Sequence, residues 1–477
     1  MNKNTSALPT IPRRDFLVKS AISLGACTIL PAYLTSARAA DNPKLPPSRR
    51  INLACIGIGG QAGGVIPGLH GNGAAMPIAF ADVDHVRGKK MIEKYPEAKV
   101  YHDFRIMLDE MGKDIDAVSV ITPDHTHFVA TILAMSMGKH VYTEKPLTHT
   151  FEEAEILMRA EKKFKVVTQM GNHGHTSSGA EQFKIMVSNG IISDIVKIEA
   201  WKSAGLWFMN SKDRISQYPS QEPMPQSLKS WELWCGPREV HPFSYKYHPF
   251  NWRAFYCYGG GMFGDWGAHI IDFAHDHLKL GLPTRIKAVQ CFDHNSILYP
   301  RSSHITFQFP ARGPGLPELV LDWKAGGDLK VPTADPKFAE VQNNGESKIP
   351  NLGGVGSFLH RKQNDYLISR GSHGAVSRIY PQKTMVEFGE KVKGKKPAYD
   401  HYQGFIEACK GNGTTESPFS KAGELTQVLI LGTIAEYLNA ELNFNPANKR
   451  FVGNDSANDL LVGAPPRAEW AGYYKLA

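Results

Sequence analysis

A glycine-rich turn directly after a short apolar strand constrains the fold of this chain more than any other feature. Residues 51–56 predict a buried strand that runs into Gly57, Ile58, Gly59, Gly60, Gln61 and Ala62. The pattern is G-x-G-x-x-G/A, in which two glycines allow a tight turn and close approach of a pyrophosphate, and a small third residue lets the next helix pack on the strand. The N–H groups that open this helix can bind phosphate oxygens. Residues 57–62 therefore predict a dinucleotide-binding turn.

The next hundred residues alternate between strand and helix patterns. Expected strands cover residues 77–81, 116–121 and 139–143, and expected helices cover residues 86–94 and 128–137. This alternation predicts an α/β fold with a Rossmann-type, doubly wound parallel sheet.

The second strand ends at Asp82, where a carboxylate can accept hydrogen bonds from the adenosine ribose. Its negative charge would repel a 2′-phosphate, so the sequence favours NAD over NADP. Asp84 is the nearby alternative for the same role.

Two polar clusters follow the later strands, at the sheet edge where ligands bind. Thr122, Pro123 and His125 belong to the first cluster, and Glu144 and Lys145 belong to the second. The first cluster contains two histidines but lacks a third metal ligand, so we interpret both clusters as lining the cofactor and expect no metal. Lys145 is the candidate for chemistry because a lysine at this edge lies close to the cofactor.

Taken together, these motifs resemble the Gfo/Idh/MocA oxidoreductases. The resemblance extends to Asn251-Trp252-Arg253 and to the glycine-rich stretch at residues 259–272, and it covers nearly all of the chain after residue 50. It implies an N-terminal Rossmann domain (51–170) and a C-terminal α/β domain (171–477). The latter has an open, mostly antiparallel sheet that often makes an oligomer contact, so we expect a homo-oligomer. Polar, glycine- and proline-rich segments at 209–226 and 328–396 are expected insertions.

The same resemblance places Lys145, Asp265 and His269 on the family's catalytic residues. It also implies substrate contacts by Asn172, Trp252, Arg253, Asp265 and His269. Asp265 and His269 are four residues apart, so on a helix they share one face, and a carboxylate there would favour the imidazolium. We expect His269 to act as general base with Asp265 as its partner and Lys145 to polarise the substrate oxygen, although Lys145 and His269 could exchange roles.

The first 40 residues predict a removable export signal. An arginine pair at Arg13 and Arg14 precedes an apolar run at residues 21–34, which is shorter than the roughly 20 residues that span a bilayer. Ala37-Arg38-Ala39 then matches a cleavage site. We expect export by the twin-arginine machinery to the periplasm, followed by a polar linker at 41–50. Acylation of Cys27, which lies in a lipobox-like sequence, is the alternative and would anchor the protein to a membrane.

Charge and cysteine content exclude several other classes. The formal net charge is +8, but the first 40 residues contribute five basic side chains and one acidic side chain, so the remainder is too mildly basic to indicate binding to nucleic acid or a membrane surface. After residue 40 the cysteines are irregularly spaced and odd in number, which is not the pattern of a disulfide framework or a zinc site. Cys235 and Cys257 could still pair in an oxidising compartment.

Export constrains the expected function, because twin-arginine substrates cross the membrane folded and could carry a cofactor with them. We expect NAD-dependent hydride transfer from a sugar or cyclitol, with a tightly held cofactor that is recycled within a turnover. The alternatives are a redox-neutral glycoside hydrolase, which would oxidise, eliminate and reduce in sequence, and a non-catalytic sugar- or cofactor-binding protein.

Overall fold

Residues 51–170, which include the glycine turn, contain a six-stranded sheet in the order β3-β2-β1-β4-β5-β6, and every neighbouring pair in it is parallel. The computed structural model describes residues 50–205, 207, 214–341 and 346–477, so the expected export signal lies outside the described residues. The strands are β1 (Ile51–Ile56), β2 (Ala75–Ala81), β3 (Lys99–Tyr101), β4 (Ala117–Val120), β5 (His140–Thr143) and β6 (Thr168–Met170). The expected doubly wound parallel sheet is confirmed.

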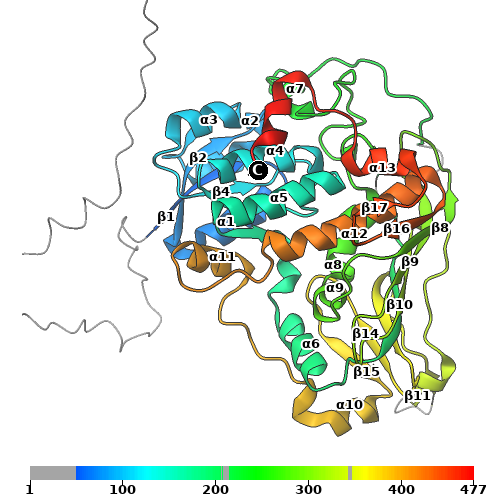
Figure 1. Ribbon diagram of the computed structural model, residues 1–477. Coiled ribbons are helices and arrows are strands. Elements are labelled where there is room, and N and C mark those ends of the chain that lie inside the picture. The colour runs from blue at the N-terminus through cyan, green and yellow to red at the C-terminus, as the bar shows by residue number, and fades with distance from the viewer. Residues whose placement is uncertain (1–49, 206, 208–213, 342–345) are drawn as a thin grey trace, which may run out of the picture. The chain divides into compact units, whose positions relative to one another are not determined.

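Both faces of this sheet are covered, because alternate residues of β1 are buried on opposite sides. Leu53 and Cys55 pack with α1 and the later helix α11, whereas Ala54 and Ile56 join the core beneath α3, α4 and α5 (Figure 1). The helices are α1 (Ala62–His70), α2 (His85–Lys94), α3 (Phe104–Met111), α4 (Asp124–Ser136), α5 (Phe151–Phe164) and α11 (His401–Cys409).

A second sheet has nine strands in the order β15-β14-β13-β7-β10-β9-β8-β16-β17. Its β7–β10 pair is parallel and its other pairs are antiparallel, which confirms the expected mostly antiparallel sheet. The strands are β7 (Ile195–Lys202), β8 (Arg285–Phe292), β9 (Ser302–Phe309), β10 (Leu319–Ala325), β13 (Val355–Arg361), β14 (Leu367–Arg370), β15 (Ser377–Tyr380), β16 (Glu441–Asn445) and β17 (Arg450–Phe451). A short hairpin of β11 (Glu340–Val341) and β12 (Ser347–Lys348) stands apart.

The segment expected as an insertion at 328–396 is built into this sheet. It supplies β13, β14 and β15, and β13 pairs directly with β7. The other expected insertion differs, since its described part, residues 214–226, contains neither helix nor strand. The first segment is therefore a structural part of the second sheet.

Two C-terminal helices join the sheets. Helix α12 (Phe419–Leu438) packs against α5 on one side and against β8 and β9 on the other (Figure 1). Helix α11 returns to the first sheet, where the Gln403 side chain donates a hydrogen bond to the Gly68 carbonyl over 2.7 Å. Residues 50 onward accordingly lie within one compact unit, although the chain changes sheets near the expected domain boundary at 170.

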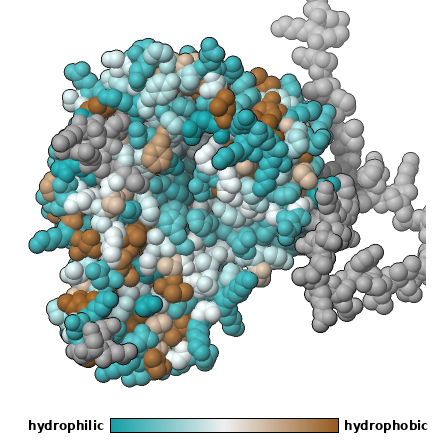
Figure 2. Space-filling view, turned by 180° about the vertical axis from the view of Figure 1, so that it is seen from behind, coloured by the Kyte–Doolittle hydropathy of each residue, from teal (hydrophilic) through white to brown (hydrophobic). Residues whose placement is uncertain are grey.

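Six further α-helices are found among the described residues. They are α6 (Ser178–Ser188), α7 (Trp231–Cys235), α8 (Ala268–Ile270), α9 (Asp272–His277), α10 (Gln382–Phe388) and α13 (Asp455–Val462). Within the described part of the chain, no helix combines the length and apolar composition needed to cross a bilayer. On the face in Figure 2, hydrophobic residues form separate small patches among hydrophilic ones. Cys235 and Cys257, whose pairing the sequence left open, are both free thiols.

Candidate active site

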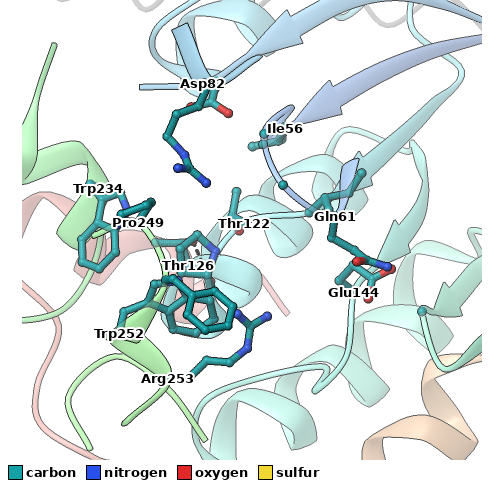
Figure 3. A pocket seen from close by; sticks show the side chains of 18 of the residues that line it. Ile56, Gln61, Asp82, Thr122, Thr126, Glu144, Trp234, Pro249, Trp252 and Arg253 are labelled. Carbon is teal, nitrogen blue, oxygen red and sulfur yellow. Dashed lines mark hydrogen bonds between the residues drawn. The ribbon is translucent and has the colours of Figure 1, made fainter. Parts of the chain in front are cut away.

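A cavity of about 490 Å³ runs along the carboxyl ends of the parallel strands. One wall comes from residues that follow successive strands, namely Gly57, Asp82, Thr122, Lys145 and Gly171. The opposite wall comes from the chain beyond residue 200, and Figure 3 shows Trp234, Pro249 and Trp252 on one side with Ile56, Gln61 and Glu144 on the other. The cavity thus lies at the sheet edge where open parallel sheets bind ligands.

The glycine turn keeps its end of the cavity open. Gly57 has φ +80°, and a Cβ at this position would lie 2.5 Å from the Ile121 carbonyl oxygen, so a side chain is excluded both by conformation and by space. A Cβ on Gly59 would lie 3.3 Å from Arg87 Cβ. Backbone can therefore approach a ligand closely here. The tight turn predicted at Gly57 is thus present, and the role of both glycines in binding a dinucleotide stays a prediction.

Asp82, rather than Asp84, faces the cavity. The Asp82 carboxylate accepts hydrogen bonds from the backbone N–H groups of Ile58 (2.8 Å) and Asp84 (2.9 Å), and burial raises its pKa. Asp84 instead caps α2 by accepting from the N–H groups of Val86 and Arg87. The two aspartates that the sequence could not distinguish therefore have different structural roles.

Lys145, Arg253 and Asp265 form an ion cluster at the other end. The Lys145 Nζ bonds the Asp265 carboxylate and also donates to the Asp265 carbonyl over 3.3 Å, and the Arg253 Nε lies 3.5 Å from the same carboxylate. Burial alone would raise the pKa of Asp265, but the two cations outweigh it and lower that pKa. The Arg253 guanidinium also stacks 4.1 Å above the Trp252 ring, so its plane is fixed.

His269 lies in the same cavity but does not pair with Asp265, contrary to the sequence-based expectation. The two cations draw the Asp265 carboxylate to themselves, while the His269 ring stacks on His373 with 3.9 Å between centroids. His269 is only 7% exposed, and burial, then Lys145 and His373, holds its pKa well below the usual value. The imidazole is therefore neutral, not the imidazolium that a carboxylate neighbour would favour.

His269 lines the cavity, and one of its ring nitrogens is enclosed by protein. Nδ1 is buried and has no hydrogen-bond partner among the described residues. Because Nδ1 is enclosed, Nε2 is the nitrogen that a ligand can reach. A neutral imidazole with one accessible nitrogen can accept a proton from a hydroxyl group.

Glu144 brings a second carboxyl group to the cavity. It is buried beside Gly171, where a Cβ would lie 2.5 Å from its Oε1, and its oxygens contact the Tyr142 hydroxyl and the Lys145 N–H. Burial raises the pKa of Glu144 to about 7, although Lys145 opposes the shift. This carboxyl can therefore be protonated near neutral pH.

Four predicted site residues are not part of the cavity lining, namely Ile58, Ala62, His125 and Asn172. His125 lies in the first turn of α4 and is buried, with its ring nitrogens 3.1 Å and 2.8 Å from the carbonyl oxygens of Tyr258 and Trp234. Asn172 donates to Asp272, which also bonds His175. His125 and Asn172 thus hold neighbouring segments together, and apart from these four the predicted site residues line the cavity.

Sequence reasoning missed several residues of the lining. They are Arg87, His102, Phe104, His173, Trp207, Trp234, His248, Phe250, Trp266 and His373. Arg87 follows Asp82 closely in sequence and could have been noticed for that reason. His373 lies in the stretch taken for an insertion, and flanking glycines at 371 and 374 were its only sequence hint. Among the described residues, no group of three or more His, Cys, Asp or Glu side chains is placed to hold a metal ion.

Comparison with known proteins also indicates a dinucleotide-binding fold in the first part of the described chain. The model of the Gfo/Idh/MocA oxidoreductase family, with an NAD-binding Rossmann fold, matches residues 51–172. A scyllo-inositol 2-dehydrogenase (NADP(+)) of Bacillus subtilis is 32% identical over 111 residues, which are 23% of this chain and 30% of that protein. A D-glucoside 3-dehydrogenase of Escherichia coli is 30% identical over 118 residues, which are 25% of this chain and 33% of that protein. The alignments thus span about a third of these relatives.

A solved structure extends the likeness in fold to both sheets. The WlbA dehydrogenase of Chromobacterium violaceum, solved with NADH and UDP-GlcNAcA, superposes with a TM-score of 0.55 at 15% identity, over 83% of this chain and 96% of that one. The family model thus matches residues 51–172, and the described chain shares its overall fold with this solved dehydrogenase.

Proposed function

We propose that this protein is an NAD(P)-dependent oxidoreductase that removes hydride from a CH–OH group of a sugar or cyclitol. The observation that carries the proposal is the continuity of one cavity. It joins the glycine turn and Asp82 at one end to Lys145 and His269 at the other. A dinucleotide laid along the strand ends would bring its reactive ring toward these two side chains. The inositol and glucoside dehydrogenases that align with about a quarter of this chain support the same class of reaction.

The residues present fit a dinucleotide. Gly57 and Gly59 bring backbone without side chains to the cavity wall, and α1 begins at Ala62 directly after this turn, as in sites where a helix N-terminus binds a pyrophosphate. Asp82 supplies an acceptor for ribose hydroxyls, and Thr122 and Pro123 line the path between the two ends of the cavity. A nicotinamide, when bound, supplies the hydride acceptor.

The protein groups at the substrate end divide the remaining work. His269 Nε2 takes the hydroxyl proton, because it is neutral and faces the cavity. The Lys145 ammonium donates to the same oxygen and stabilises the developing alkoxide. Asp265 acts on Lys145 and Arg253, holding both cations in place. This assignment replaces the expected Asp265–His269 pair with an Asp265–Lys145 pair.

We also propose that the cofactor is retained between turnovers. The clasp, defined here as residues 228–250, crosses the cavity beside Asp82. Its Lys229 N–H donates to the Val83 carbonyl over 2.9 Å, and its His248 Nε2 lies 3.7 Å from the Asp84 carboxylate. Trp234, His248, Pro249 and Phe250 of the clasp line the cavity. A cofactor beneath this clasp would leave only when the clasp moves, which supports a prosthetic role.

NAD is the proposed cofactor over NADP, because Asp82 would repel a 2′-phosphate. Arg87 lines the same end and would attract that phosphate, so the preference depends on the balance of two side chains.

The decisive experiment begins with the cofactor that the purified protein already carries. The protein is denatured, and released NAD and NADP are assayed separately; we expect NAD. The loaded protein is then mixed with myo-inositol, scyllo-inositol, D-glucose and methyl β-D-glucoside, and NADH is followed by absorbance. An increase in NADH absorbance would support oxidation of the added sugar or inositol. Release of a chromogenic aglycone from a nitrophenyl glycoside, without net NADH, would instead identify a glycoside hydrolase.

The export signal at residues 1–40 leads to a proposal about location. We propose that the twin-arginine machinery carries the folded, loaded protein to the periplasm, where the bound cofactor is recycled. Replacing Arg13 and Arg14 by lysine should leave the protein in the cytoplasm when cell fractions are blotted. An unchanged distribution would contradict this route. Intact mass of the exported protein distinguishes cleavage after Ala39 from acylation at Cys27.

We further propose that the outer face of the nine-stranded sheet mediates a homo-oligomer. This face presents charged side chains that form ion pairs, including Lys197 with Glu199 on the same strand and with Asp322 on the neighbouring β10. Light scattering of the purified protein tests the proposal, and a monomer at micromolar concentration would contradict it.

A further inference from the structure

His373 reaches the active-site cavity from the loop between β14 and β15. Its ring stacks on His269 at 3.9 Å with 27° between planes, and it meets the Trp266 ring edge-on at 5.3 Å. The His173 ring lies 5.6 Å away. Three imidazoles thus gather at the substrate end, and His373, unlike His269, is exposed to solvent.

The loop holds His373 in an unusual conformation. Its φ is +54°, in the left-handed region that non-glycine residues rarely adopt. The adjoining Gly374 packs so closely on the chain before α6 that a Cβ on Gly174 would lie 2.6 Å from its nitrogen. Ser177 Oγ also donates to the Gly374 carbonyl over 3.2 Å. Strained residues that packing holds in place cluster at functional sites, so the conformation points to a role for the ring.

The proposed reaction leaves a proton in a buried position. Oxidation of a CH–OH group breaks its O–H bond, and the proton goes to His269 Nε2. His269 is 7% exposed, so the proton must pass another group before it reaches bulk water. Lys145 is held by Asp265, whereas His373 covers the His269 ring and is itself exposed.

We propose that His373 is a proton-transfer residue that carries this proton between His269 and solvent. The inference rests on the proposed function. Since the two rings are stacked, their nitrogens do not point at each other, and the proton crosses through a water molecule that touches both rings. It moves from His269 to this water, from the water to His373, and from His373 to bulk solvent, so no other reactant is needed.

The surrounding charges suit a group that releases its proton readily. The partial burial of the His373 ring, with His173 and Lys145, lowers the pKa of His373 to about 4, while Asp265 acts in the opposite direction. His269 is neutral for similar reasons. At neutral pH both rings of the stacked pair are therefore uncharged at the start of a turnover, and a protonated His373 favours release of its extra proton to solvent.

Solvent access can be tested without any substrate. The loaded protein is treated with diethyl pyrocarbonate at pH 7, and modified histidines are identified by peptide mass spectrometry. We expect modification of His373 before His269. Modification of His269 first, or of neither ring, overturns the relay.

The kinetic test compares His373→Asn with the wild type and with Val376→Ala, a control on the same loop whose side chain is 52% exposed. Reduction of the bound cofactor is followed after mixing with the sugars and inositols named above. We expect His373→Asn to slow reduction by about tenfold or more. Added imidazole should restore its rate but leave the wild-type rate unchanged. The bound-cofactor content and thermal midpoint of each variant verify folding.

The outcomes distinguish failure of the His373 relay from failure of the proposed oxidoreductase function. If wild-type and His373→Asn rates agree within twofold, or if a slow variant does not respond to imidazole, the relay is wrong while the proposed function stands. If the wild type reduces its cofactor with none of the probes, the proposed function fails on these substrates and the relay falls with it.

Discussion

The two ends of the cavity are built in different ways. The cofactor end is largely a local structure, since Gly57 to Ala62 and Asp82 lie within one strand–helix–strand unit, which the clasp joins from later in the chain. The substrate end is assembled from side chains that are far apart in sequence, including Lys145, Asp265 and His373. A contiguous motif can specify the first kind of site, whereas the second exists only after both sheets have formed. Substitutions at the cofactor end should therefore lower cofactor binding, whereas substitutions at the substrate end should lower the rate of cofactor reduction.

The largest expected effect is at the substrate end. His269→Asn should slow reduction of the bound cofactor by about 10²- to 10⁴-fold, because it removes the proton acceptor. The cofactor content should stay near the wild-type value, since His269 lies at the other end from the glycine turn. Stopped-flow absorbance and cofactor assay of the same sample measure both. His304→Asn, on a strand of the second sheet, is the matched control. A loss of bound cofactor in His269→Asn would contradict the separation of the cavity into a cofactor end and a substrate end.

The second-largest effect is expected from a substitution at the cofactor end. Gly57→Ala places a Cβ 2.5 Å from the Ile121 carbonyl in a backbone with φ +80°, so the turn must shift. We expect cofactor content to fall by about tenfold or more, because 1.4 kcal/mol of lost binding already gives that factor. Gly63→Ala is the control, since a Cβ there meets nothing within 4 Å in helix α1, and it should retain the cofactor. Equal cofactor content in both variants would contradict the assigned role of the turn.

A smaller effect concerns the choice of cofactor. Asp82→Asn removes a negative charge from the ribose end and leaves Arg87 in place, so NADP binding should improve relative to NAD by about tenfold, or roughly 1.4 kcal/mol. Equilibrium binding of the two dinucleotides to protein stripped of cofactor measures this ratio. Arg87→Ala should move it in the opposite direction. A ratio that neither substitution changes would show that the ribose binds elsewhere.

The smallest effect tests the clasp. Phe250 lines the cavity and is 55% exposed, so Phe250→Ala removes only part of a side chain's apolar contact, worth about 1 kcal/mol. Exchange of bound NAD for labelled NAD should accelerate by about fivefold, with little change in the rate of reduction. Tyr245→Ala is the control, because Tyr245 lies on the clasp at 51% exposure but outside the cavity lining. Equal exchange rates in the two variants would argue against retention by the clasp.

Much of the fold could be predicted from the sequence because its strands are short, apolar and followed by recognisable turns. β1 was predicted with the bounds it has, and β5 was predicted to within one residue. Helix α4 was predicted to begin at residue 128 but begins at Asp124, because Pro123 precedes a polar first turn that resembles a loop in sequence. This shift explains why His125 is buried against Trp234 and not beside the cofactor.

The substrate end could be predicted only in part. The resemblance to the family predicted that Lys145, Asp265 and His269 share one site. It did not predict which side chains each of them contacts. Asp265 bonds Lys145 and Arg253 because two cations converge on it in three dimensions, which the four-residue spacing to His269 could not reveal. His373 depends on the packing of one loop against Gly174, a contact that no local pattern encodes.

The account depends most directly on the presence of a dinucleotide in the cavity. Purified protein is denatured, and the supernatant is assayed for NAD and NADP against the protein concentration. We predict close to one NAD per chain for the wild type and little for Gly57→Ala. A wild-type protein that carries neither dinucleotide, and that binds neither when both are added, would contradict the central claim.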